Sequence, residues 1–253
     1  MSQTRAGIAN MTASLASLTD TQLFNSRVVP SGPIQLENGD RLTRLEFLRR
    51  WEAMPKLKRA ELIEGIVYMA AAVRVPQHAR PHGWLFNVLS TYAMHTGVDF
   101  GDNATVQLDP DNAPQPDICL FLPNPLGGKA KINDDGYLQG PPELIAEVAV
   151  SSASIDLHAK FQVYRRHGVR EYIVWRVLEQ ALDWFVLRDE VYVSHVLQDG
   201  RFKSVVFPGL WLDPVALLAF NSERLHAALN EGMASPEYLK FRVQVQPFAP
   251  KPT

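Results

Sequence analysis

The sequence has little cysteine, no long hydrophobic run and no strong excess of charge. Its 253 residues contain one cysteine, Cys119, which excludes an internal disulfide framework and a cysteine-rich zinc module. Cys119 lies in the apolar run ICLFL, where a buried packing thiol is more common than a nucleophile. The longest clearly apolar stretch, VYMAAAV, is far shorter than the roughly 20 residues that a membrane-spanning helix needs. The net charge of −2 gives no long-range attraction to nucleic acid, although a local basic cleft is compatible with it.

Several motifs that would point to other functions are also missing from the sequence. It has no glycine-rich phosphate loop, no serine elbow and no aromatic signature of RNA binding. The first residues lack both a basic cluster and a continuous hydrophobic segment, so we expect no secretory signal. They are rich in Ser, Thr and Ala and faintly resemble an organelle transit peptide, but a loosely ordered extension is the commoner interpretation. We therefore expect a cytoplasmic protein that does not bind membranes.

What the sequence does contain is typical of a globular domain, with 46% hydrophobic and 21% charged residues. We expect an N-terminal extension at 1–42, partly disordered, a domain at 43–222, and a C-terminal helix with a polar, proline-containing tail at 223–253. Hydrophobic spacing predicts helices and strands. The expected helices are 43–54, 56–65, 78–97 (ending at Gly97), 155–168 and pieces of 207–220 and 223–232, and the expected strands are 66–73, 98–108, 116–122, 143–150, 171–177, 181–187, 190–197 and 201–207.

These elements show no regular alternation of strands and helices, which argues against an all-parallel sheet. The last strands, from 171 onward, alternate and turn like an antiparallel meander, and the glycine-rich stretch at 124–142 is expected to be a mobile loop or a flap. We therefore predict a single α/β (α+β) domain with one mixed, mainly antiparallel central sheet flanked by helices.

One charged residue stands inside a strongly apolar run. The stretch PPELIAEVAVSS is typical of a central strand covered on both faces, and Glu147 lies in its middle. A lone ionised carboxylate in such a place costs several kcal/mol. Glu147 therefore needs a proton, a cationic side chain or a metal ion. An ion pair with Arg170 or another arginine is the plainest alternative to a metal.

Two further charged residues occupy positions that folding alone would give to other residue types. Asp117 follows a proline at the start of the run ICLFL, where its ordinary role would be to cap a turn. Lys160 lies three residues after Leu157 and four before Tyr164, so it shares the inward face of the predicted helix. A lysine there either extends to the surface or reaches a buried anion.

Considered together, Asp117, Glu147 and Lys160 predict one catalytic site. Carboxylates on two neighbouring strands suit a hard cation such as Mg²⁺ (or Mn²⁺), which keeps several waters and takes one or two protein carboxylates. Such an ion polarises a phosphoryl oxygen and lowers the pKa of a bound water. Lys160 would position that water or offset charge on the phosphorus. The predicted chemistry is hydrolysis of a phosphodiester bond, with Asp117 and Glu147 as metal ligands.

The same residues carry a resemblance to a known family. A PD pair at Pro116-Asp117, Glu147 in an apolar strand and Lys160 in the next helix are similar to the PD-(D/E)XK nuclease superfamily. The stretches ELIEGI, EVAVSS and DLHAKFQVYRRHGVREYIVW resemble, in the same order, motifs of its Uma-type restriction endonuclease-like family. The similarity covers about residues 44–220. It implies a restriction-endonuclease-like core and a metal-dependent endonuclease that acts on DNA.

The resemblance adds two candidate site residues and shows two departures from the family pattern. Glu61, expected on the first helix or its end, is a further acidic candidate, and His78 is a candidate at the opening of a helix. The superfamily's usual lysine, two positions after the glutamate, is Ala149 here, and Lys160 matches the lysine that this family has in the following helix. The family's SPS segment has lost its proline at 150–152, which removes no ligand.

Two other patterns have ordinary explanations beside functional ones. His78 and His82 form an H-x-x-x-H pair that could bind zinc, but Pro81 interrupts the turn and no glutamate follows His78, so a chance pair is favoured. The stretch KLKR and the pair Arg165-Arg166 could contact phosphates, but a solvated helical face is the commoner explanation.

Two functional hypotheses from different classes remain. The first is an Mg²⁺-dependent endonuclease acting on DNA. The second keeps the fold with a vestigial site, as a module that binds nucleic acid or another protein. The near-neutral charge gives this second hypothesis some weight. A nuclease that cuts both strands often acts as a symmetric dimer, so the sequence leaves a homodimer open.

Overall fold

The computed structural model describes residues 34–69, 74–150 and 155–250. Within the chain, Gln35–Thr253 form one compact unit. Most of the extension predicted at 1–42 lies outside the described ranges. So do residues 151 and 152 of the segment that lacks the family's proline. The predicted division at 42 and 222 stays a prediction. None of the helices in these ranges combines the length and the apolar character needed to cross a bilayer.

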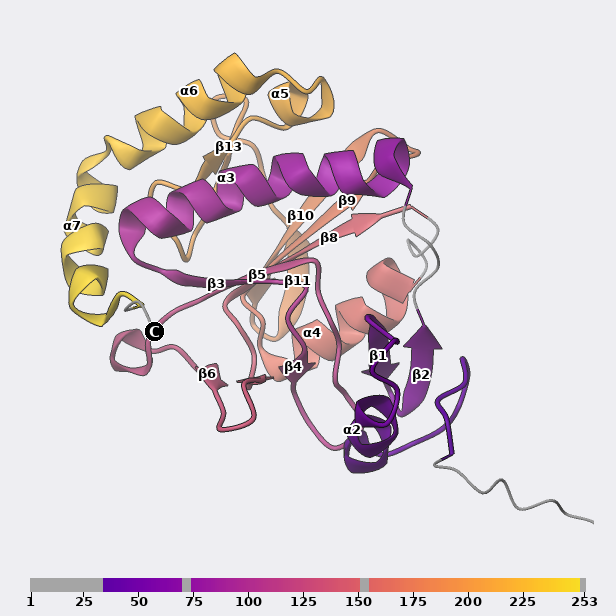
Figure 1. Cartoon of the computed structure of the whole chain (residues 1–253). Coiled ribbons are helices and arrows are strands. Elements are labelled where there is room, and N and C mark those ends of the chain that lie inside the picture. Colours follow the sequence, from indigo (N-terminus) through magenta and orange to yellow (C-terminus); the bar gives the residue numbers. More distant parts are fainter. Residues whose placement is uncertain (1–33, 70–73, 151–154, 251–253) are drawn as a thin grey trace, which may run out of the picture. The chain divides into compact units, whose positions relative to one another are not determined.

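A six-stranded sheet lies at the centre of this unit, in the order β11-β10-β9-β8-β5-β3 (Figure 1). Its strands are β3 (Asp99–Asp102), β5 (Ile118–Phe121), β8 (Leu144–Ala149), β9 (Glu171–Arg176), β10 (Ala181–Arg188) and β11 (Val191–Ser194). Neighbouring strands are antiparallel except β8 and β9, which are parallel. The predicted mixed, mainly antiparallel sheet is therefore confirmed.

Helices cover both faces of this sheet, with α3 (Arg80–Thr96) on one face and α4 (Phe161–His167) on the other (Figure 1). Successive residues of a strand point to opposite faces. On β8, Ala146 and Val148 pack in the core that includes α3, whereas Ile145 and Ala149 pack in the core that includes α4. The alternation places Glu147 on the α4 face. All six residues of β8 are buried, as predicted for a strand covered on both faces.

Local signals in the sequence determine where the main helices begin and end. The helix α2 (Arg44–Glu52) starts after Thr43, whose hydroxyl accepts a hydrogen bond from the Glu46 N–H. A turn of π-helix (Val75–Ala79) precedes α3, which ends at Gly97 in the left-handed conformation, as predicted. A second π-helical turn (Ile155–Lys160) continues directly into α4.

The helix predicted at 56–65 is wrong, because β1 (Ala60–Ile63) forms an antiparallel hairpin with β2 (Ile66–Met69). The strands turn at Glu64 and Gly65, which both have positive φ, at 52° and 73°. Such a two-residue turn matches the twist of a hairpin. The expected position of Glu61 on a helix is corrected with it, because Glu61 lies within β1. Residues 70–73, the rest of the predicted strand, lie outside the described ranges.

The stretch predicted at 124–142 to be a mobile loop or a flap contains short elements. They are a 3₁₀ turn (Asn124–Leu126), β6 (Lys131–Ile132) and β7 (Leu138–Gln139). The two strands form a small sheet with β4 (Val106–Gln107), which pairs in parallel with β7. Its mobility stays a prediction.

The C-terminal part contains more helix than predicted. The meander β9-β10-β11 is confirmed, but β12 (Phe202–Lys203) pairs with β13 (Trp211–Leu212) instead of extending it. Three helices and a 3₁₀ turn follow: α5 (Pro214–Leu218), α6 (Ser222–Met233), α7 (Pro236–Val245) and Gln246–Phe248. The predicted polar tail is thus largely helix α7, because Ser235 caps it and Tyr238 and Val245 pack into the core with α3.

Cys119 has the packing role predicted for it. Its side chain is fully buried in β5, and burial raises the pKa of the thiol to about 12. A thiol held in its neutral form is a poor nucleophile.

Candidate active site

Asp117 and Glu147 face each other across two antiparallel strands. The register of β5 and β8 pairs Ile118 with Ala146, which places Asp117 opposite Glu147. The N–H of Asp117 donates to Glu147 Oε2 at 3.3 Å, and the N–H of Val148 donates to Asp117 Oδ2 at 2.7 Å. Both side chains are buried. The structure therefore brings together the two carboxylates that the sequence placed on neighbouring strands.

Lys160 reaches this pair from the helical segment that covers the same face of the sheet. Its Nζ lies 2.9 Å from Glu147 Oε1 and 2.8 Å from Glu61 Oε1, and its side chain is only 3% exposed. Lys160 therefore does not extend to the surface. Glu147 is therefore in a buried ion pair, but its cation is Lys160 and not the arginine that the alternative to a metal named. Tyr164, one turn later, also donates its hydroxyl to Glu147 Oε1, at 3.1 Å.

Glu61 joins the cluster from β1, on a different sheet. Its Oε1 accepts the N–H of Gln115, at 2.7 Å, in addition to its contact with Lys160. Gln115 lies two residues before Asp117 in the chain. Glu61 thus connects the segment that leads into β5 with Lys160.

Arg59 is a member of the cluster that the sequence analysis missed. Its Nη2 donates to Asp117 Oδ1 at 2.9 Å and to the carbonyl oxygen of Gln115 at 3.2 Å. Because alternate residues of a strand share a face, Arg59 just before β1 points the same way as Glu61. This signal was available in the sequence, but the helix predicted at 56–65 concealed it.

The two histidines of the H-x-x-x-H pattern contact different carboxylates. His78 Nε2 lies 3.5 Å from Asp117 Oδ2, whereas His82 Nε2 lies 3.0 Å from Asp102 Oδ1. Their rings stack with centroids 5.9 Å apart. The structure therefore places His78 at the cluster, and His82 Nε2 also lies 3.5 Å from the carbonyl oxygen of Asp117.

The electrostatics of the cluster keep Asp117 and Arg59 charged. Burial acts to raise the pKa of Asp117, but hydrogen bonding from His78, the charge of Arg59 and the Val148 N–H outweigh it and hold this pKa well below its usual range. Burial likewise acts to lower the pKa of Arg59, but the charges of Asp117, Glu147 and Glu61 raise it. Asp117 is therefore an anion at neutral pH.

The donor groups of the cluster suit a hard divalent ion that keeps part of its water. Asp117 and Glu147 offer only oxygen atoms, which Mg²⁺ and Mn²⁺ prefer. In the ranges that the structure describes, no group of three or more His, Cys, Asp or Glu residues could hold a metal ion by itself. Next to the cluster, Gln115 Oε1 is buried and accepts no hydrogen bond from the described residues. A divalent ion at this cluster would have the two carboxylates as its protein ligands and water as the others.

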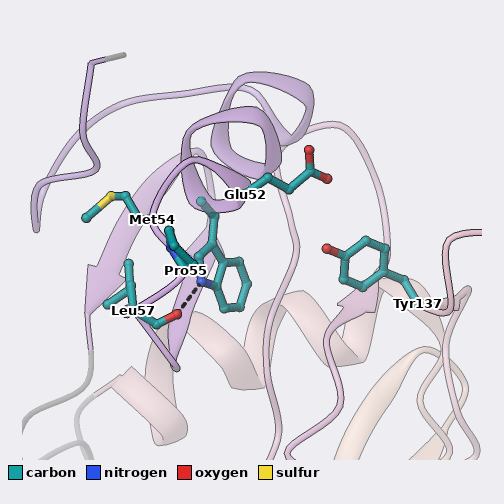
Figure 2. Close-up of a pocket in the computed structure, with 6 residues that line it drawn as sticks. Glu52, Met54, Pro55, Leu57 and Tyr137 are labelled. Carbon is teal, nitrogen blue, oxygen red and sulfur yellow. Dashed lines mark hydrogen bonds between the residues drawn. The ribbon is translucent and has the colours of Figure 1, made fainter. Parts of the chain in front are cut away.

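A pocket of about 160 Å³ has no residue of this cluster in its lining (Figure 2). It is lined by Trp51, Glu52, Met54, Pro55, Leu57 and Tyr137. The Trp51 Nε1–H donates to the Leu57 carbonyl oxygen at 2.9 Å. In Figure 2, Tyr137 lies across the pocket from Pro55 and Leu57. No residue predicted for the site lines this pocket. The cluster around Asp117 and Glu147 is therefore the better candidate for chemistry.

Comparisons with known proteins support the fold and identify the family. No curated protein matches the chain. A crystal structure of a putative nuclease belonging to DUF820, from Anabaena variabilis ATCC 29413, matches with a TM-score of 0.50 and 14% sequence identity, over 67% of this chain and 97% of that one. At this identity the likeness shows the fold. The family model Uma2, described as putative restriction endonuclease, matches residues 45–216. This match spans more than half of the chain and confirms the resemblance seen in its motifs, so the chain belongs to the Uma2 family.

Proposed function

We propose that this protein is a nuclease that hydrolyses phosphodiester bonds in DNA with the help of a divalent cation. The observation that carries the proposal is the buried cluster in which Asp117 and Glu147 face each other and Lys160 contacts Glu147. A buried charged cluster that folding alone would not favour is a candidate functional site. Membership of a family described as restriction endonucleases supports the same reaction.

Asp117 and Glu147 would hold the cation, Mg²⁺ or Mn²⁺, and Glu61 is close enough to Lys160 to affect the charge of the same site. When bound, the ion supplies polarisation of the phosphoryl group and acidification of a water. The protein's own contribution is to hold the two carboxylates at a fixed spacing. The backbone N–H groups of Asp117 and Val148 do this, since each donates to a carboxylate from the opposite strand.

Lys160 is the electrostatic catalyst of the proposal. In hydrolysis the oxygen of water forms a bond to phosphorus and one P–O ester bond breaks, its electron pair leaving with the alkoxide, which then takes a proton. The transition state gathers negative charge on the phosphoryl oxygens, and a fixed ammonium offsets it without reorganisation. Contacts with Glu147 and Glu61 fix the Lys160 ammonium before substrate arrives.

The test is a supercoiled-plasmid nicking assay with Mg²⁺ or Mn²⁺, with a chelator control. The proposal expects nicking that depends on the cation and that is lost in Asp117→Ala. Absence of cation-dependent nicking by the wild-type protein, or undiminished nicking by Asp117→Ala, would contradict it. A linear duplex and a single-stranded RNA of matched sequence serve as further substrates and show whether DNA is preferred.

A vestigial site is the second candidate function, and a specific observation favours it. The side chains of Arg59 and Lys160 already contact the three carboxylates of the cluster, at 2.8 to 2.9 Å. A protein with such internal compensation could bind nucleic acid or a partner protein without a metal. The two candidates differ in the effect of Mn²⁺ or Mg²⁺ on the thermal unfolding temperature, which rises only where the folded protein binds the ion.

A further inference from the structure

Arg59 is the group in the cluster to which neither the motifs nor the comparisons give a role. Its side chain is 22% exposed, and its hydrogen bonds to described residues come from Nη2 alone, which donates to Asp117 Oδ1 and to the Gln115 carbonyl oxygen. A guanidinium carries five N–H donors in a planar fork. Among the described residues, the Nε and Nη1 donors of Arg59 therefore have no acceptor, and they can serve an incoming anion.

The two oxygens of the Asp117 carboxylate have different partners. Oδ2 accepts the Val148 N–H at 2.7 Å and lies 3.5 Å from His78 Nε2, which anchors the carboxylate to β8. Oδ1 is the oxygen that Arg59 contacts. A divalent cation bound at Oδ1 would lie close to the Arg59 guanidinium, and like charges at that separation repel. An ion that binds Oδ1 therefore weakens the contact between Asp117 and Arg59 and favours movement of Arg59 away from it.

The charges of the cluster show where a displaced Arg59 would be useful. Among the groups joined by the ion pairs at 2.8 to 2.9 Å, the carboxylates of Asp117, Glu147 and Glu61 outnumber the cations of Arg59 and Lys160 by one. A divalent ion reverses this to an excess of one positive charge. One phosphodiester group, which carries a single negative charge, would then neutralise the site. A planar guanidinium matches the oxygens of a phosphate better than an ammonium does.

We infer that Arg59 exchanges partners, holding Asp117 in the cation-free protein and binding the substrate's phosphate group once a divalent cation occupies the site. The inference rests on the proposed function. In this arrangement Arg59 weakens cation binding in the absence of substrate and strengthens phosphate binding in its presence. The two ligands are thereby coupled, whereas an arginine with a purely structural role would couple nothing.

The experiment measures cation and phosphate binding separately, in the full-length protein and without nucleic acid. Mg²⁺ is titrated by calorimetry and by thermal unfolding, and inorganic phosphate is then titrated at saturating Mg²⁺. The variants are Arg59→Met and Arg59→Lys. The matched control is Lys58→Met, which removes the same charge from the neighbouring, exposed residue. Among the described residues, the Lys58 Nζ donates only to the Pro55 carbonyl oxygen.

Arg59→Met is expected to lower the Mg²⁺ concentration at half-saturation by about tenfold and to weaken phosphate binding at saturating Mg²⁺ by about tenfold. Arg59→Lys keeps the charge but loses the fork, so it should change Mg²⁺ binding less and still weaken phosphate binding. Lys58→Met should change each value less than about twofold, as expected for an exposed charge. Circular dichroism checks that each variant folds. If Arg59→Met does not fold, phosphate binding by Arg59→Lys tests the inference.

An unchanged Mg²⁺ half-saturation in a folded Arg59→Met, or unchanged phosphate binding in both Arg59 variants, overturns the inference and leaves the proposed nuclease function intact. A wild-type protein that shows no response to Mg²⁺ or Mn²⁺ overturns the proposed function and this inference together. The two failures are therefore distinguishable in one set of titrations.

Discussion

The carboxylates of Asp117 and Glu147 are each hydrogen-bonded to the backbone of the other's strand. Glu147 Oε2 accepts from the N–H of Asp117, and Asp117 Oδ2 accepts from the N–H of Val148. The antiparallel register of β5 and β8 places Glu147 opposite Asp117, which stands directly before β5 (Ile118–Phe121). A side chain at the start of a paired strand is positioned more precisely than a side chain on a free loop.

The first prediction concerns the charge of Asp117. Asp117→Asn keeps an oxygen for the Val148 N–H but loses the anion that Arg59 contacts. We expect nicking to fall by about 10²-fold or more, and the free energy of unfolding to fall by about 1 to 3 kcal/mol. Plasmid nicking and urea unfolding measure the two effects.

The control for this prediction is Asp99→Asn on β3 of the same sheet. Burial raises the pKa of Asp99, so neutralising it should not reduce stability at neutral pH. Nicking should stay at the wild-type level. Equal loss of activity in both variants would show that any carboxylate of the sheet supports the reaction, which contradicts a specific role for Asp117.

The second prediction concerns Lys160, which lies between Glu147 and Glu61. Lys160→Met removes a buried cation from between two carboxylates, and we expect a loss of about 3 to 5 kcal/mol in the free energy of unfolding at neutral pH. Adding Glu61→Gln should restore part of the loss, because it removes one of the two anions. Denaturant unfolding of the single and double variants measures this coupling. Lys131→Met, at an exposed position on β6, is the control and should change stability by less than about 0.5 kcal/mol.

The third prediction concerns a buried carboxylate away from the candidate site. Glu171 on β9 is fully buried, and its burial raises the pKa of the side chain to about 7. Its carboxylate accepts hydrogen bonds from the Ser204 hydroxyl and, at 2.9 Å, from the Val205 N–H. The folded state therefore holds a proton on Glu171 more tightly than the unfolded state does.

Because the pKa of Glu171 is higher in the folded than in the unfolded protein, its protonation stabilises the folded state. This stabilisation is fully present below the unfolded pKa, near 4.5, and it is lost as the pH rises through the folded pKa of about 7. We expect this group to reduce the free energy of unfolding by about 3 kcal/mol between pH 4.5 and pH 8. Glu171→Gln should remove that part of the pH dependence, whereas Glu237→Gln, at an exposed position on α7, should not. Unfolding curves at several pH values give the free energy of unfolding as a function of pH. The same pH dependence in the wild type and in Glu171→Gln would contradict the prediction.

The fourth prediction compares two glycines in helices. Gly83 in α3 has nothing within 4 Å of an added Cβ, so Gly83→Ala should raise the free energy of unfolding by about 0.5 to 1 kcal/mol. An added Cβ at Gly232 in α6 would lie 2.3 Å from the Gly209 carbonyl oxygen and 2.8 Å from Trp211 Cγ. Gly232→Ala should therefore reduce stability, by about 1 to 3 kcal/mol, despite the same gain in helix propensity. Thermal unfolding measures both changes. A rise in stability in both variants would show that α6 and the turn at Gly209 do not pack closely.

Much of the fold could be predicted because its signals are local. The apolar run around Glu147 and the helix end at Gly97 depend on residues close together in the chain, and both are found as predicted. Strand β2 was predicted, but its partner β1 was missed, because a strand of four residues is too short to distinguish its period from that of a helix. Helix α7 was missed because its hydrophobic pattern is weak, and only Tyr238 and Val245 are buried.

The sequence by itself determined which residues are out of place in a core, Asp117, Glu147 and Lys160, and which family the chain belongs to. Hydrophobic periodicity shows where a charge is buried, whereas the motifs and their order identify the family. Only the tertiary structure decided that Arg59 joins them and that Glu61, a candidate from the resemblance, does so from a strand. Both residues reach the cluster through pairing of β1 with β2 and through contacts with the segment before β5, more than 50 residues away in the chain. Such long-range contacts leave no periodic trace in the sequence, and they determine which charges face one another.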